Sequence, residues 1–119
     1  MTEIIKKLTT VTIDDTEYTL VPTLNAVRSI THVCGGLRNV GEKVIARDFD
    51  VMAAVIIAGA GLTMKPKEYD AFVESIWKSE NLGDIMEKCV EYWRVLNAGG
   101  RDPDEIDVDT DVEESEKNA

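Results

Sequence analysis

Ser29, Arg28 and His32 are the residues whose types and spacing come nearest to catalytic chemistry in this chain. A serine nucleophile needs a histidine base within hydrogen-bond reach and an acid that orients the ring, all converging in a pocket. His32 lies one helical turn from Arg28, with Ser29 close by, and a lone histidine on a small helix is usually a structural or surface residue. We therefore expect a protein that is not an enzyme and has no catalytic residue.

Three alternating aspartates near the C-terminus, Asp107, Asp109 and Asp111, resemble the opening of a calcium-binding EF-hand loop. The later positions do not fit. Val112 stands where glycine makes the sharp turn, and Asn118 stands where a bidentate glutamate completes the ligand shell. The sequence therefore favours a solvated acidic tail over a calcium site.

Cys34 and Cys89 are far apart, form no CxxC pair and sit at apolar positions of expected helices. We interpret both as reduced core residues. With His32 as the single histidine, a four-ligand zinc site cannot form without carboxylates. The glycines at 35–36 and 59–61 lack the Gly-Lys-Ser/Thr of a phosphate-binding loop and are expected to end helices. No metal or cofactor is therefore expected.

The helices and strands expected from the sequence pattern indicate a mainly α fold with an N-terminal β-hairpin (α+β). We expect a small bundle of about five helices around a short central apolar helix. We expect a single globular domain over 1–100, with the hairpin at 8–21 and helices at about 24–34, 37–46, 51–60, 66–79 and 82–98. Residues 101–119 are dense in like charge and poor in bulky apolar residues, which predicts a disordered acidic tail.

The most apolar stretch, Phe49 to Leu62, is the expected central helix. Asp50 can cap its start, and Gly59 and Gly61 can supply positive-φ residues at its end. A membrane span needs roughly 20 apolar residues, so this shorter helix is expected in the core of a soluble protein.

In the hairpin, Val11 and Ile13 share one face, Tyr18 and Leu20 share one face of the partner strand, and the intervening threonines can stand in water. An isolated two-stranded hairpin is only marginally stable in water, so we expect this hairpin to pack on helices or to pair with another chain.

Thr23 and Asn81 can cap the helices that follow them, and Pro66 suits the first turn of its own helix. Four helices show a buried face at helical spacing: Leu24, Val27, Ile30 and Cys34; Leu37, Val40, Val44 and Ile45; Tyr69, Phe72, Val73, Ile76 and Trp77; and Leu82, Ile85, Met86, Cys89, Val90, Trp93 and Leu96. The aromatic residues could form a recognition face, but core packing is favoured for all except Tyr92, which lies beside its stripe.

The net charge of −10 is concentrated in the tail. Residues 102–119 contain nine acidic residues and one lysine, a charge of −8, which leaves −2 for the rest of the chain. An acidic tail repels phosphates and the remainder offers no broad basic face, so we expect no binding to nucleic acid and none to membranes.

The order of these parts resembles that of tail assembly chaperones of long-tailed phages, in the group related to a gene transfer agent tail protein. The resemblance covers about residues 8–100. It rests on a hairpin containing DDTEYTLVPT, a helix ending in Gly-Gly, the segment DFDVMAAVIIAGAGLT, and the amphipathic helix KPKEYDAFVESIW.

This resemblance implies a non-enzymatic protein that coats the tape measure protein before the tail tube polymerises. It also implies self-association into rings or spirals, contact with the major tail protein, and a location in the cytoplasm of the bacterial host but not in the mature virion. Many such chaperones have a longer frameshifted form, and Glu116-Lys117-Asn118 can be encoded by a slippery A-AAA-AAC heptamer. The gene sequence tests this, since a GAG or AAG codon there removes the heptamer.

Three alternatives from other classes stay open at the sequence level. A structural tail protein, such as a tube or completion protein, would remain in the particle. A small acidic regulator or DNA mimic would need its carboxylates across a rigid face rather than in a tail. A helix-turn-helix regulator would need a basic recognition helix, which the sequence lacks.

Overall fold

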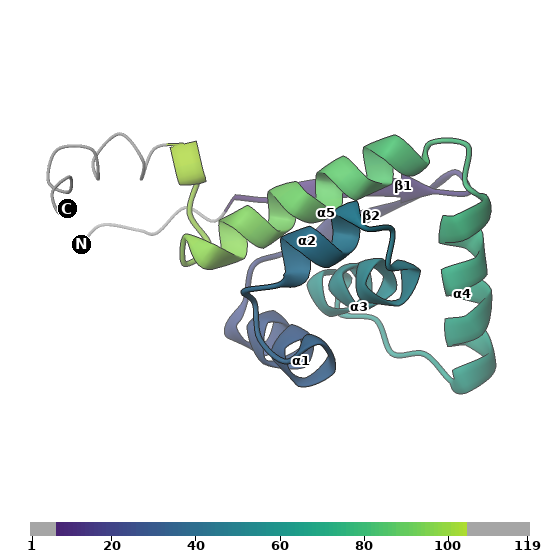
Figure 1. Ribbon diagram of the computed structural model, residues 1–119, viewed down its shortest axis with the longest axis horizontal. Coiled ribbons are helices and arrows are strands. Elements are labelled where there is room, and N and C mark those ends of the chain that lie inside the picture. Colours follow the sequence, from purple (N-terminus) through teal and green to yellow (C-terminus); the bar gives the residue numbers. More distant parts are fainter. Residues whose placement is uncertain (1–6, 105–119) are drawn as a thin grey trace, which may run out of the picture.

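The computed structural model describes residues 7–104, which form an N-terminal β-hairpin and five helices. The elements are β1 (Thr9–Ile13), β2 (Thr16–Leu20), α1 (Leu24–Cys34), α2 (Val40–Ile45), α3 (Phe49–Ala60), α4 (Pro66–Lys78) and α5 (Leu82–Asn97). The mainly helical α+β fold predicted from the sequence is confirmed. In Figure 1, α3 lies between α1 and α4, and α5 runs along the hairpin.

The central helix is α3, as predicted, and its residues from Val51 to Ile56 are all buried. The prediction of its cap was wrong. Asp48, not Asp50, is the N-cap, because its backbone is extended and its side chain accepts a hydrogen bond from the Val51 N–H at 3.1 Å. Asp50 lies within the first turn, where its charge suits the positive end of the helix dipole.

Gly61 ends α3 in the left-handed conformation, with φ +69°, as predicted. Gly59 does not end the helix. It lies inside α3, and a Cβ there would be 3.0 Å from the Tyr92 ring and from the Leu20 Cβ. Its function is therefore to let the hairpin and α5 approach the backbone of α3 closely.

The second helix is shorter than the predicted 37–46, because residues 37–39 form a turn before α2 begins at Val40. The Leu37 carbonyl accepts a hydrogen bond from the Trp93 indole N–H, which holds this turn on α5. Glycine has a low helix propensity, and Gly41 within α2 lies directly under the Trp93 ring. Packing against Trp93 therefore explains the glycine at this position.

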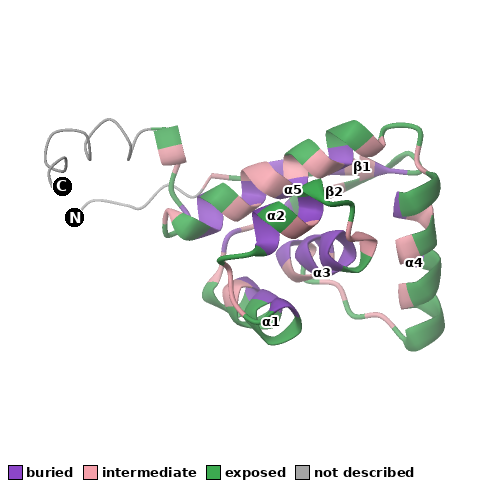
Figure 2. Ribbon diagram, viewed as in Figure 1, coloured by how far each residue is buried: buried purple, intermediate pink, exposed green. Residues whose placement is uncertain are grey.

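Several burial predictions were wrong. Leu24, Ile45 and Trp77 are 63%, 67% and 59% exposed, although each was placed on a buried stripe. Tyr92, expected beside its stripe, is fully buried, and its hydroxyl donates to the Val21 carbonyl at 2.7 Å. In Figure 2 the exposed surface is broad on α1 and α4, because each is an end helix with neighbours mainly on one side.

The hairpin register pairs Val11 with Tyr18, and Val11, Ile13 and Leu20 are buried as predicted. Thr9, which alternation places on the face of Val11, is also buried, whereas the intervening Thr10 and Thr19 are exposed as expected. Asn81 is the N-cap residue of α5 but makes no capping hydrogen bond through its side chain. That side chain donates instead to the Thr12 carbonyl at 3.0 Å, tying the helix start to the hairpin.

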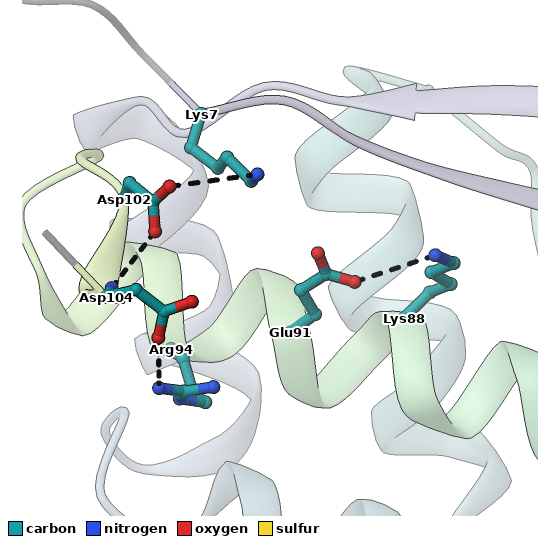
Figure 3. Close-up of polar contacts among 6 residues, drawn as sticks. All are labelled: Lys7, Lys88, Glu91, Arg94, Asp102 and Asp104. Atoms are coloured by element: carbon teal, nitrogen blue, oxygen red, sulfur yellow. Dashed lines mark hydrogen bonds and ion pairs between the residues drawn. The ribbon is translucent and has the colours of Figure 1, made fainter.

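The start of the predicted tail, residues 101–104, lies against α5 and the chain before β1. Lys7 Nζ lies 3.9 Å from Asp102 Oδ2, and Arg94 Nη2 lies 3.5 Å from Asp104 Oδ1; Figure 3 shows these side chains. The Lys7 N–H also donates to the Gly100 carbonyl at 3.0 Å. The remaining tail prediction, with the aspartates at 107, 109 and 111 and the segment 116–118, lies outside the described residues.

Candidate functional site

The residues considered for catalysis lie on the surface of α1. Arg28, Ser29 and His32 are all exposed, and within residues 7–104 no hydrogen bond or ion pair joins their side chains. In the same range, no three His, Cys, Asp or Glu side chains are grouped so that they could hold a metal ion.

Both cysteines are free and buried, as predicted. Burial raises the pKa of the Cys89 thiol to about 12. Burial also raises the pKa of Cys34, an effect opposed by the nearby Lys43 charge. Both thiols therefore stay protonated near neutral pH and behave as small apolar core groups.

An open groove of about 650 Å³ lies between α1 and the C-terminal half of α3. The loop from α3 to α4 closes one side. The residues that line the groove are Val21, Thr23, Asn25, Ser29, Val33, Ala54, Ile57, Ala58, Gly59, Ala60, Gly61, Leu62, Thr63, Met64 and Tyr69.

Helix α1 forms one wall of the groove, and hydrogen bonds at both of its ends fix where it begins and stops. The Thr23 hydroxyl accepts a hydrogen bond from the Ala26 N–H at 3.0 Å, and the Gly35 N–H donates to the Thr31 carbonyl at 2.8 Å. Ala26, Ile30 and Cys34 are buried on the face toward α3. Asn25, Ser29 and Val33, spaced four residues apart, consequently form a row along the groove.

Helix α3 forms the floor with small side chains. Ala54, Ala58 and Gly61 follow one another at helical spacing, so a bound segment can come close to the helix backbone. The Val21 N–H donates to the Gly59 carbonyl at 3.0 Å, which fixes the chain that leads into α1 onto the end of α3. This main-chain hydrogen bond therefore helps to hold one wall of the groove against its floor.

Tyr69 lies at the margin of the groove, and its hydroxyl is 3.2 Å from Asp50 Oδ1. Burial, followed by the negative charge and hydrogen bond of Asp50, raises the pKa of Tyr69 to about 12. The hydroxyl is therefore a stable neutral donor over the physiological range.

No groove residue was identified as a binding residue from the sequence, where partner-binding positions were left unknown. The available signal was Val33, an apolar residue outside the predicted stripe of α1, which is 58% exposed in the structure. Val33 becomes a candidate binding residue only because α3 packs beside α1 and the two helices form a groove, and the sequence alone does not give that packing.

Chemically, the groove can hold apolar side chains along its floor and form hydrogen bonds at its rim through Asn25, Ser29 and Thr63. Within the described residues, no helix is both long enough and apolar enough to cross a membrane. Comparison of the chain with protein-family models, with curated proteins and with solved structures finds no match.

Proposed function

We propose that this protein is a non-enzymatic phage tail assembly chaperone, which binds the tape measure protein as a homo-oligomer during tail morphogenesis. The observation that carries the proposal is the open apolar groove between α1 and α3. It is supported by the resemblance of the segment from Asp48 to Thr63 and of the following amphipathic helix to that family.

The groove suits a helical client. A helix presents apolar side chains at intervals of three and four residues, and the small residues Ala54 and Ala58 leave room for such a row. The exposed Val33 side chain then packs against the bound helix. A long apolar helical client exposes a stripe that promotes aggregation, and repeated copies of a small adaptor cover it.

In this role the protein acts in the cytoplasm of the bacterial host, contacts the major tail protein when tube subunits replace it on the client, and is absent from the finished virion. The role needs no nucleic acid and no membrane. The acidic segment 102–119 acts either as a recruiting element or as a solubilising spacer.

The test is co-expression of the tagged full-length chain with the tape measure protein encoded in the same gene cluster, followed by quantitative pull-down. Val33→Asp places a charge in the groove and should weaken capture by about tenfold. Leu24→Asp is the matched control, because Leu24 is exposed on the same helix and does not line the groove. It should retain wild-type capture.

Equal capture by the wild-type chain and the Val33→Asp variant would contradict the groove as the client site. Mass spectrometry of purified virions tests the role itself, since abundant protein in the particle would indicate a structural tail component. Deletion of residues 102–119 separates the two roles of the tail, because unchanged pull-down dismisses recruitment.

A further inference from the structure

Trp77 is a large aromatic side chain that the fold leaves 59% exposed on α4. Phe72 and Ile76 on the same helix are buried and hold α4 against the rest of the protein, so Trp77 is not needed for this packing. Trp77 instead borders a hollow of about 390 Å³ formed by the first turn of α3 and the outer part of α4. We call this site the Trp77 hollow; its residues are Phe49, Asp50, Asp70, Val73, Glu74 and Trp77.

The Trp77 hollow combines an apolar base with acidic side chains. Phe49, Val73 and Trp77 supply the apolar surface, and every charged residue that lines the hollow is a carboxylate. Within residues 7–104, neither Asp50 nor Asp70 takes part in an ion pair. This composition is complementary to a group that has an apolar stem and a cationic end.

Of the carboxylates in the hollow, Glu74 takes part in an ion pair within residues 7–104, in which Lys78 Nζ lies 2.8 Å from Glu74 Oε2. Both side chains are more than half exposed, so water screens this pair and a partner's cation can compete for Glu74. Asp50 also accepts the Tyr69 hydroxyl hydrogen bond at 3.2 Å, which leaves its second carboxylate oxygen available.

We infer that the Trp77 hollow is a second binding surface, distinct from the groove, and that it takes an arginine side chain on a segment of a partner protein. A planar guanidinium stacks on an indole ring and bonds a carboxylate through two parallel N–H groups, while its methylene stem covers apolar surface. Carboxylates repel phosphates, so the charge of the hollow disfavours nucleic acid. This inference does not depend on the identity of the client in the groove.

The test uses a fluorescein-labelled synthetic amphipathic helix with leucine on one face and arginine on the other, and a matched helix with glutamate in place of arginine. Anisotropy is measured with the full-length protein at physiological ionic strength. The arginine helix should bind the wild-type chain, more weakly as salt rises, and the glutamate helix should not bind.

Two variants address the hollow. Trp77→Ala removes the aromatic surface, and the double variant Asp70→Asn/Glu74→Gln removes two carboxylates on an exposed helix face. Each should weaken binding of the arginine helix by about tenfold. The matched control is Glu17→Gln/Glu80→Gln, which removes the same charge from exposed positions outside the hollow. Binding by this control should change by less than about twofold.

Three results would overturn the inference. An equal loss in the control variant would show that the peptide responds to overall charge. Unchanged binding by Trp77→Ala would show that the aromatic surface is not used. Sedimentation showing that Trp77→Ala dissociates an oligomer of the wild-type chain would make a second copy the occupant. Circular dichroism tests whether each variant is folded. If Trp77→Ala is unfolded, the comparison of Asp70→Asn/Glu74→Gln with its control variant decides the question.

Discussion

The Tyr69 hydroxyl lies 3.2 Å from Asp50 Oδ1, and this hydrogen bond joins the groove to the Trp77 hollow. Tyr69 lines the groove beside α1, whereas Asp50 lines the Trp77 hollow. The same contact fastens the start of α4 to the start of α3. A change at either residue therefore affects the wall between two candidate binding surfaces.

Stability should decrease as the pH rises from 10 to 12. Burial and Asp50 raise the pKa of Tyr69 from 10.0 to about 12, and burial alone does the same for Tyr92. Between these pH values an unfolded tyrosine loses its proton while the folded one keeps it, so the unfolded state binds fewer protons and is favoured. Chemical denaturation at a series of pH values measures this decrease.

Tyr69→Phe removes the contribution of Tyr69, so its stability should fall less steeply over the same alkaline range. The variant should also lose about 1 kcal/mol or less near neutral pH, because the hydrogen bond is partly exposed. An alkaline slope identical to that of the wild-type chain would show that the Tyr69 pKa is not raised.

Gly41→Ala should destabilise the protein by about 1–3 kcal/mol, although alanine is the better helix former. A Cβ at position 41 would lie 2.6 Å from Cζ3 of Trp93, and the ring would have to move. Gly83→Ala is the matched control in α5, because a Cβ there has no neighbour within 4 Å. It should stabilise by about 0.5 kcal/mol. Similar gains from both substitutions in urea unfolding would contradict the Trp93 contact.

Val55→Asp should unfold the protein or leave it with a much lower melting temperature. Val55 is 0% exposed at the centre of α3, and an unpaired carboxylate buried there costs several kcal/mol. Val33→Asp, at a position 58% exposed, serves as the control and should remain folded. A monodisperse, cooperatively folding Val55→Asp protein would refute the description of α3 as the buried central helix.

The two cysteines should react with a thiol reagent at different rates in the native protein. Cys34 retains 8% exposure and Cys89 has none, and burial raises the pKa of Cys89 to about 12. Cys89 should therefore react only when the chain opens, and both thiols should react at once in denaturant. Time courses with Cys34→Ala and Cys89→Ala assign the phases, and fast native labelling of Cys89 would contradict its burial.

Local signals in the sequence were sufficient to predict the positions of the hairpin and of most helix ends. Thr23, Gly35 and Pro66 act through hydrogen bonds and backbone angles within a few residues, and each lies where the sequence predicted it. The cap of α3 was misplaced by two residues, because Asp48 and Asp50 are both able to cap and the backbone conformation selects between them.

The width of each buried face depended on the tertiary structure. Helical periodicity gives the direction of an apolar stripe around its axis, but the number of neighbouring elements sets how much of that stripe is covered. As an end helix packed mainly on α3 and α5, α4 leaves Trp77 in solvent. Tyr92, between the hairpin and α3, is enclosed completely.

The sequence by itself therefore determined the fold class, the central position of α3 and the reduced, buried cysteines. Only the tertiary structure decided the two candidate binding surfaces, because each combines residues from helices whose relative position is not encoded in local spacing. Val33 of α1 and Ala58 of α3 both line the groove, and Asp50 of α3 and Trp77 of α4 both line the Trp77 hollow, because packing brings these separate segments together.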